Sequence, residues 1–283
     1  MDRRPPPIVF IHGIWLHSSS WGPWLEFFRE AGFEAHAPRW PHESPTVEET
    51  RRHAERMARF GYGAVTRHFA GIVERLDEKP ILIGHSVGGH VAQKLHAMGL
   101  ARATIAIAPV QFRGVRGLPL SQLQAVIPFL RNPANYSRAI SLTPTQFHRI
   151  YASEVPREES DRIHARWAIP SPVRPLFQTA LANLTRRSKA QVEVGNTNVG
   201  PLLIVAGERD RVVPVSVARE EALLYHKAPS FTILPNRGHS LVVDHGWREV
   251  AQICLAWLAR HGLAPMLPPP RAPGPAPWEA RER

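Results

Sequence analysis

Residues 81–90, ILIGHSVGGH, combine a short apolar run with a serine that has glycines two positions before and two positions after it. The run 81–83 is typical of a buried strand, and apolar residues recur at helical spacing after the serine. A serine at the tip of a sharp strand-to-helix turn has a strained backbone, and small residues on either side let the strand and the helix pack closely. The pattern Gly84-His85-Ser86-Val87-Gly88 therefore predicts that Ser86 is a nucleophile; the alternative is a glycine-rich turn without a chemical role.

Short apolar runs alternate with longer amphipathic segments along much of the chain. The runs are residues 8–11, 33–37, 81–83, 103–108, 202–206 and 231–234. Strands that are apolar on both faces are typical of parallel sheets covered by helices on both sides. The alternation predicts an α/β fold with a mostly parallel sheet of about six strands and helices on both faces.

The chain divides by its pattern into four parts. Residues 1–110 and 201–264 carry the alternation of strands and helices, whereas residues 111–200 show no convincing strand. We expect this middle part to be a helical cap on the α/β core, with helices at 120–130, 145–152, 157–167 and 173–184 and a capping box formed by Thr143 and Gln146. Residues 265–283 contain seven prolines and no hydrophobic periodicity, which predicts a disordered tail.

A serine nucleophile needs a general base, and the base needs a carboxylate that orients it. In this kind of fold the acid and then the base follow later strands of the sheet. Asp210 lies just after the run 202–206, and His239 lies just after the run 231–234, so we predict that they are the acid and the base. Their rivals in the same loops are Glu208, Asp244 and His245. Among these, Asp244 is better placed to cap the last helix.

Acyl transfer also requires backbone N–H groups aimed at the developing oxyanion. Val87 directly follows Ser86 at the start of a helix, where the helix dipole adds positive potential. The second donor is expected after the first strand, where the step His12-Gly13 lets the backbone approach the serine. We favour the N–H of Ile14 there, with Trp15 as a substitute; the alternative is an ordinary turn at the end of a strand.

Taken together, these motifs resemble the α/β-hydrolase superfamily, in particular its cap-bearing, esterase-like branch with a serine nucleophile. The matching features, in chain order over about residues 8–261, are His12-Gly13, the helix with Trp21 and Trp24, the motif around Ser86, residues 207–210 and Gly238-His239. The resemblance implies that Ser86 is the nucleophile, His239 the base, Asp210 the acid, and Ile14 and Val87 the oxyanion donors. Some members begin with an additional antiparallel pair of strands, which this sequence lacks before its first run.

The resemblance implies hydrolysis of a carboxylic ester or a thioester through an acyl-enzyme, without a metal or an organic cofactor. Haloalkane dehalogenases and epoxide hydrolases of this superfamily have an aspartate where this chain has Ser86. Hydroxynitrile lyases have a lysine directly after the catalytic histidine, where this chain has Ser240. Two alternatives remain open: a serine-dependent lyase or carbon–carbon hydrolase, and a receptor-like protein with little turnover.

The substrate is less well defined by the sequence. We expect Trp15 and Trp167 to contact it, whereas the aromatic residues Phe129, Phe147, Tyr151 and Phe177 could line a pocket or form the core of the cap. Seven of the eleven excess positive charges fall in residues 111–200, which suggests anionic substrates or simply a chain rich in arginine.

Partners and location follow from composition. The arginines are scattered, so we expect a small-molecule substrate rather than nucleic acid as the partner. No run of 18 uncharged apolar residues is present and the first residues do not form a signal sequence, so we expect no membrane contact and a cytoplasmic protein. The single cysteine, Cys254, lies in an apolar run and is expected to be a buried thiol. The sequence leaves the oligomeric state open.

Overall fold

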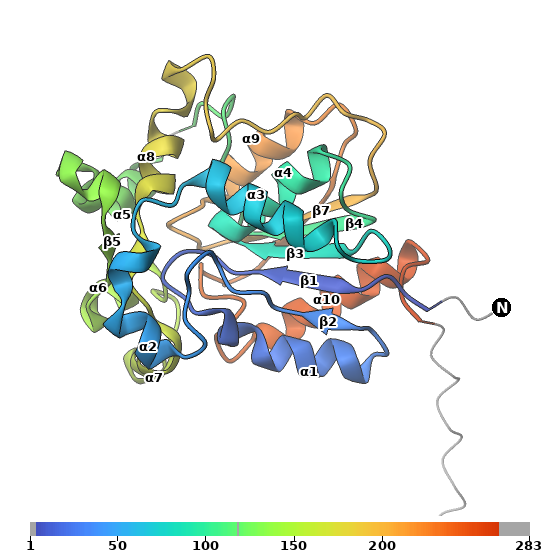
Figure 1. The fold of residues 1–283 in the computed structure, drawn as a ribbon, viewed down its shortest axis with the longest axis horizontal. Helices are drawn as coiled ribbons and strands as arrows, with labels where there is room; N and C mark the ends of the chain where they lie inside the picture. The colour runs from blue at the N-terminus through green and yellow to red at the C-terminus, as the bar shows by residue number, and fades with distance from the viewer. Residues whose placement is uncertain (1–3, 118, 266–283) are drawn as a thin grey trace, which may run out of the picture.

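The computed structural model of the chain describes residues 4–117 and 119–265, and it is built on one sheet of six parallel strands (Figure 1). The strands are β1 Ile8–Ile11, β2 Ala35–His36, β3 Ile81–His85, β4 Ala103–Ile107, β7 Leu202–Gly207 and β8 Ser230–Leu234. Their order across the sheet is β2-β1-β3-β4-β7-β8. The predicted α/β fold and its six-stranded parallel sheet are confirmed. The proline-rich tail lies outside the described residues, apart from Pro265.

Helices cover both faces of the sheet. On one face lie α1 Gly22–Glu30 and α10 Trp247–Arg260, and on the other lie α3 Tyr62–Val73, α4 Val87–Ala97 and α9 Val215–Leu223 (Figure 1). Every residue of β1, β3, β4 and β7 is buried, as expected for strands between two helical layers. The thiol of Cys254 on α10 is also buried, and burial raises its pKa. In the described ranges no helix combines the length and the apolar character needed to cross a bilayer.

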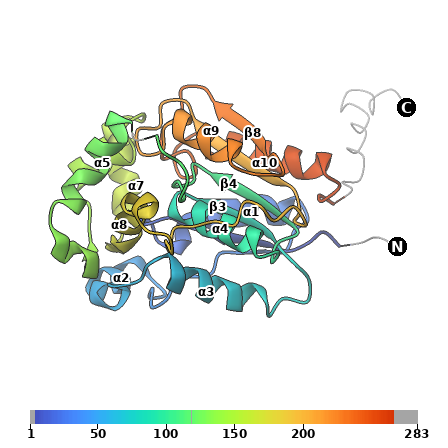
Figure 2. The same ribbon diagram turned by 90° about the horizontal axis from the view of Figure 1, so that it is seen from above.

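The helical part of the segment between β4 and β7 lies beyond the carboxyl ends of the strands, and the loop after it runs back along α4 to the start of β7 (Figures 1 and 2). The elements of the segment are α5 Leu120–Leu130, η3 Pro133–Ser137, β5 Ala139–Ile140, α6 Pro144–Ile150, α7 Arg157–Trp167, β6 Ser171–Pro172, α8 Arg174–Ala180 and η4 Ala182–Leu184. The expected capping box starts α6, since the N–H of Gln146 lies 3.2 Å from Thr143 Oγ1 and the N–H of Thr143 lies 2.9 Å from Gln146 Oε1. The antiparallel pair β5–β6 was not expected, because strands of two residues leave no alternating pattern.

The first part of the chain contains further short elements before β3. They are η1 Ser18–Trp21, α2 Val47–Arg52 and η2 Ala54–Met57. The run 33–37 forms a strand only at Ala35–His36, although Phe33 is buried in the core. At this edge of the sheet the apolar run 33–37 therefore indicates which residues are buried, but it does not give the length of the strand.

Candidate active site

Ser86 stands at the turn between β3 and α4 with φ 56° and ψ −122°. A positive φ is unusual for a residue with a side chain, and the surrounding contacts hold it. The N–H of Ser86 donates to Ile107 O at 3.0 Å, and Ser86 O accepts from the N–H of Val110 at 3.1 Å. The flanking glycines are required by space: a Cβ on Gly84 would lie 2.3 Å from Gly88 O, and one on Gly88 would lie 2.1 Å from Ile11 O.

The three residues predicted to act together are brought into contact. Nε2 of His239 lies 3.0 Å from Ser86 Oγ, and Nδ1 of His239 lies 2.7 Å from Asp210 Oδ2. Each of the three residues is 3% exposed, so the contacts are shielded from water. The three residues follow β3, β7 and β8, whose carboxyl ends meet at one edge of the sheet.

Asp210 is itself fixed by the backbone of its own loop. Its Oδ1 accepts from the N–H groups of Val212 and Val213, each at 2.8 Å, while Oδ2 faces His239. Hydrogen bonds from two N–H groups stabilise the ionised carboxylate. This leaves the second oxygen aligned with the imidazole, which fixes the ring and the position of its proton.

The rival residues have other partners. Glu208 accepts from the N–H of Asn236 at 2.9 Å, and His245 contacts Glu159 at 3.0 Å. Asp244 forms a buried ion pair with Arg237 and accepts from Ser240 Oγ at 2.9 Å. Burial raises the pKa of Asp244, and the charge of Arg237 opposes that rise. The expectation that Asp244 caps the last helix is wrong, because α10 begins at Trp247 with Gly246 in the cap position.

Two further residues, His85 and Tyr151, contact His239, the predicted base. Nε2 of His85 donates to His239 O at 3.0 Å, and the hydroxyl of Tyr151 donates to His85 Nδ1 at 3.3 Å. Burial lowers the pKa of His85 well below its usual value, and the nearby His239 adds to the effect, so the His85 imidazole is neutral. The Tyr151 ring meets the His239 ring edge to face at 5.2 Å. The motif gave no hint of Tyr151, which comes from the segment between β4 and β7.

The backbone groups predicted to face the oxyanion lie beside Ser86. Gly13 packs so closely that a Cβ there would lie 2.9 Å from Ser86 Cβ. Considering only residues 4–117 and 119–265, neither the Ile14 N–H nor the Val87 N–H donates a hydrogen bond. The N–H of Trp15, the substitute for Ile14, donates to Ser171 Oγ at 2.7 Å. Ile14 is therefore better suited than Trp15 to receive an oxyanion.

The two tryptophans expected to contact substrate are held by protein groups. Trp15 Nε1 donates to Ile140 O at 3.1 Å, and its ring packs on Phe129 with centroids 5.1 Å apart. The guanidinium of Arg166 covers the ring of Trp167 at 4.5 Å. Both tryptophans are buried, and their contact with substrate remains a prediction.

An apolar cavity of about 200 Å³ lies near the three contacting residues, although none of the three lines it. It is lined by Val110, Gln111, Gln122, Leu123, Val126, Leu130, Leu176, Thr179, Ala180 and Val212. Two of these lining residues are hydrogen-bonded to the site: the N–H of Val110 donates to Ser86 O, and the N–H of Val212 donates to Asp210 Oδ1. The remaining walls come mainly from α5 and α8.

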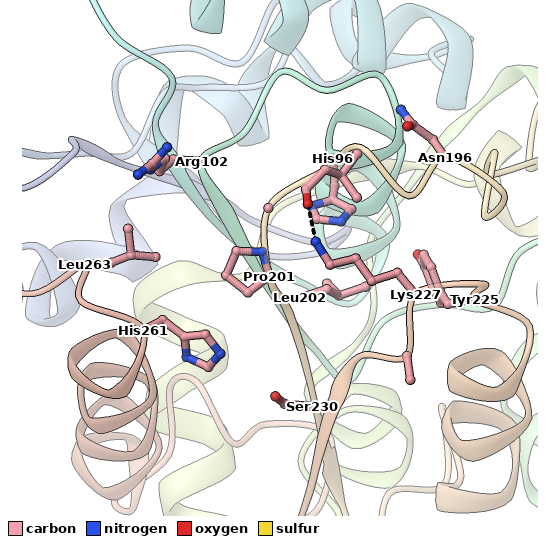
Figure 3. Close-up of a pocket in the computed structure, with 13 residues that line it drawn as sticks. His96, Arg102, Asn196, Pro201, Leu202, Tyr225, Lys227, Ser230, His261 and Leu263 are labelled. Atoms are coloured by element: carbon pink, nitrogen blue, oxygen red, sulfur yellow. Dashed lines mark hydrogen bonds between the residues drawn. The ribbon is translucent and has the colours of Figure 1, made fainter.

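A second cavity, of about 480 Å³, lies at the opposite edge of the sheet, where β4, β7 and β8 begin (Figure 3). It is lined by His96, Arg102, Lys227 and His261 among other residues, and no carboxylate is among them. Its place at the amino ends of the strands separates it from Ser86. Across residues 4–117 and 119–265, no three His, Cys, Asp or Glu side chains are grouped as metal ligands would be.

A model of the alpha/beta hydrolase family matches residues 8–253. The chain belongs to the alpha/beta hydrolase family. A search of curated protein sequences finds no match.

Solved structures of the same fold include a monoacylglycerol lipase from Paleococcus ferrophilus, 18% identical over 91% of this chain and 96% of that one, with a TM-score of 0.62. A pyrethroid hydrolase from Sphingobium faniae is 18% identical over 90% of this chain and 97% of that one, with a TM-score of 0.63. A methylesterase from Arabidopsis is 16% identical over 90% of this chain and 99% of that one, with a TM-score of 0.62. At these identities the likeness concerns the fold, and the chemistry has to be argued from the site.

Proposed function

We propose that this protein is a serine hydrolase that cleaves a carboxylic ester or thioester through an acyl-enzyme on Ser86. The observation that supports the proposal best is the position of His239, whose two ring nitrogens face Ser86 Oγ at 3.0 Å and Asp210 Oδ2 at 2.7 Å. That is the arrangement in which an imidazole takes a proton from a hydroxyl while a carboxylate stabilises the charge it gains.

In the first half of the reaction, Ser86 Oγ attacks the carbonyl carbon of the substrate while His239 Nε2 accepts the hydroxyl proton. The carbonyl oxygen becomes an oxyanion, and the N–H groups of Ile14 and Val87 stabilise it. His239 then gives its proton to the leaving alkoxide or thiolate. The leaving group departs as a neutral alcohol or thiol, and the acyl group stays on Ser86.

In the second half, a water molecule takes the place of the leaving group. His239 removes a proton from the water, and the resulting oxygen nucleophile attacks the acyl carbon. The new oxyanion faces the same two N–H groups. When the intermediate collapses, His239 returns the proton to Ser86 and the carboxylic acid is released.

The cavity between α5, α8 and the core is the best candidate for the acyl pocket. Its volume of about 200 Å³ is smaller than the roughly 300–1,000 Å³ of pockets for larger ligands, so a short or compact acyl group is expected. We infer that the segment 111–200 acts as a cap that encloses this group, since α5 and α8 supply much of the wall. Structural neighbours named as a lipase and a methylesterase agree with ester cleavage.

The test is a panel of p-nitrophenyl esters from acetate to decanoate, assayed with the wild type and with Ser86→Ala. We expect turnover of the short esters, a decline with chain length, and loss of turnover in the variant. A fluorophosphonate probe should add one adduct to the wild type and none to Ser86→Ala, as measured by intact mass. Full activity of Ser86→Ala would refute the proposal, and a single slow turnover with a persistent adduct would favour the receptor-like alternative.

A further inference from the structure

Glu43 is a second buried carboxylate, placed in the loop between β2 and α2. Its side chain is fully covered by the protein. Oε1 accepts from the N–H of Ser18 at 2.8 Å, and Oε2 accepts from the N–H of Trp40 at 3.3 Å. Oε2 also lies 2.7 Å from Nε2 of His12, in the loop that leads from β1 to the predicted oxyanion donor. A buried carboxylate needs such partners, because it has lost the hydration of the ionised form.

The hydrogen bonds of His12 define its charge. Nδ1 donates to Gly13 O at 2.8 Å, so this nitrogen carries a proton. Nε2 has no donor facing it among the described residues, and the Glu43 carboxylate lies beside it, off the axis of a ring N–H. A lone pair on Nε2 would be repelled by the carboxylate, whereas an N–H there is attracted to it. The geometry around His12 therefore favours a proton on both ring nitrogens.

The second histidine in contact with Glu43 differs. Nδ1 of His17 accepts from the N–H of Ser19 at 3.1 Å, so the proton of the ring lies on Nε2. That Nε2 faces Glu43 Oε1 at 3.2 Å and Ser44 O at 3.1 Å. Burial lowers the pKa of His17, and the charge of Glu43 only partly opposes this, so His17 is neutral. Of the two histidines, His12 is thus the one placed to balance the charge of Glu43.

The carboxylate is held in its ionised form by these contacts. Burial by itself would raise the pKa of Glu43, but the adjacent His12, then His17 and the hydrogen bond from Ser18, lower it to about 2. Near neutral pH the Glu43 carboxylate is therefore ionised.

The peptide that His12 binds is the one that carries the predicted oxyanion donor. The carbonyl of Gly13 and the N–H of Ile14 belong to the same peptide unit. This unit is planar and trans, so the N–H points away from the C=O. A hydrogen bond that fixes Gly13 O therefore also fixes the direction of the Ile14 N–H. A cationic donor on the carbonyl also polarises the peptide and makes its N–H a better donor.

We propose that Glu43 is a positioning residue that keeps His12 charged, so that His12 holds the Gly13–Ile14 peptide with its N–H aimed at the oxyanion. This inference rests on the proposed function, since it assigns a task within the same site. Glu43 does not touch the substrate and acts only through His12. Trp40 supports the arrangement, since its Nε1 donates to His12 O at 3.0 Å.

The kinetic test compares Glu43→Gln with a matched control, Glu34→Gln. Glu34 also contacts a histidine, His36, at 2.8 Å, but that pair is exposed and distant from Ser86 in the sheet. Loss of one oxyanion donor costs about 10²–10³ in kcat, and misorientation should cost somewhat less, about 10- to 100-fold. We expect this fall in kcat for Glu43→Gln with little change in KM, partial recovery in Glu43→Asp, and wild-type kinetics in Glu34→Gln. Wild-type kcat in a folded Glu43→Gln would overturn the proposal.

A second measurement does not depend on activity or on the folding of Glu43→Gln. With ¹⁵N-labelled histidine, the wild type should show both ring nitrogens of His12 protonated near neutral pH, assigned by the loss of the signals in His12→Asn. A neutral His12 in the wild type would overturn the inference even if the protein is an active esterase. Conversely, if no ester is cleaved but His12 is doubly protonated, the proposed function fails while the Glu43–His12 pair stands.

Discussion

Two buried carboxylate–histidine pairs lie near the same serine, and they differ in their chemistry. Asp210 and His239 follow the strands β7 and β8, whereas Glu43 and His12 lie in loops after β2 and β1. The distance between nitrogen and oxygen is 2.7 Å in each pair, and all of the side chains are buried. Distance and burial alone would thus assign them the same role.

The difference lies in what the second nitrogen of each histidine faces. Nε2 of His239 faces a hydroxyl, which donates a proton and can accept one back. Nδ1 of His12 faces a carbonyl oxygen, which only accepts. The His239 imidazole can therefore exchange a proton with its neighbour during a reaction, whereas the neighbour of His12 Nδ1 has no proton to exchange. A proton-transfer group and a positioning group are distinguished by the neighbour of one nitrogen.

Glu221 supplies a third case, a buried carboxyl group without a histidine. Its Oε1 accepts from Gln93 Nε2 at 2.6 Å, and Oε2 has no partner within the part of the chain that the structure describes. Burial raises the pKa of Glu221 well above its usual value, and the hydrogen bond from Gln93 only partly opposes this. Glu43 and Asp210 thus share a histidine partner and backbone N–H donors, whereas the described residues give Glu221 neither.

The largest expected effect comes from breaking the proton-transfer pair at its reactive end. Ser86→Ala and His239→Ala should each lower kcat for a short ester by about 10⁶, because the nucleophile or the base is removed. The measurement is steady-state hydrolysis of p-nitrophenyl acetate after background subtraction, with circular dichroism to verify folding. Substantial residual turnover in either variant would mean that the chemistry resides elsewhere.

Asp210→Asn tests the carboxylate of the same pair. The amide cannot stabilise the imidazolium and favours the wrong tautomer of His239, so kcat should fall by about 10⁴. Glu208→Gln is the matched control, since Glu208 contacts the N–H of Asn236 rather than His239. If kcat fell strongly in Glu208→Gln and stayed near the wild-type value in Asp210→Asn, the acid would have been assigned to the wrong residue.

Gly13→Ala tests the loop that the charged pair is proposed to hold. The added Cβ would lie 2.9 Å from Ser86 Cβ and 3.0 Å from His85 O, so the loop must shift away from the serine. We expect kcat to fall by about 10²–10³, the cost of a lost oxyanion donor. Gly71→Ala on α3 is the control, because only the end of Arg75 lies near a Cβ there. Equal kinetics of the two variants would argue against Ile14 as a donor.

Glu221→Gln sharpens the comparison with an effect on stability alone. The pKa of the Glu221 carboxyl group is higher in the folded protein than in the unfolded chain. The folded state therefore loses stability as the pH rises from the unfolded-state pKa to the folded-state pKa. Relative to the variant, the wild type should therefore lose up to about 1.4 kcal/mol of unfolding free energy per pH unit over that range. Urea unfolding near pH 5 and near pH 8 measures this, with kcat unchanged. If the unfolding free energies of the wild type and of Glu221→Gln changed equally with pH, the pKa of Glu221 would not be raised by folding.

The sequence was sufficient where the signal is local. Residues 81–90 contain the strand, the strained serine and the glycines that the turn needs, and the alternation of apolar runs predicts the parallel sheet. The residues that follow later strands, Asp210 and His239, could be predicted because a parallel sheet brings its carboxyl ends together.

The rest depends on contacts between distant segments. Nothing near Glu43 in the sequence indicates that it meets His12, because a loop after an edge strand brings them together. The N–H of Trp15 is taken by Ser171, which lies 156 residues further along the chain. Asp244 was misjudged for a related reason: Arg237 pairs with its side chain, and the helix starts later. Local propensity carries no information about such pairings.

Tyr151 has a consequence for any attempt to exchange the segment between β4 and β7 with that of another protein. Its hydroxyl reaches His85 and its ring supports His239, so the segment supplies part of the scaffold under the base. A chimaera that joins helices from another protein to this core would need a tyrosine at the same place. Without it, the His239 ring would lose its edge-to-face contact. The segment between β4 and β7 and the placement of the His239 ring therefore have to be exchanged together in this molecule.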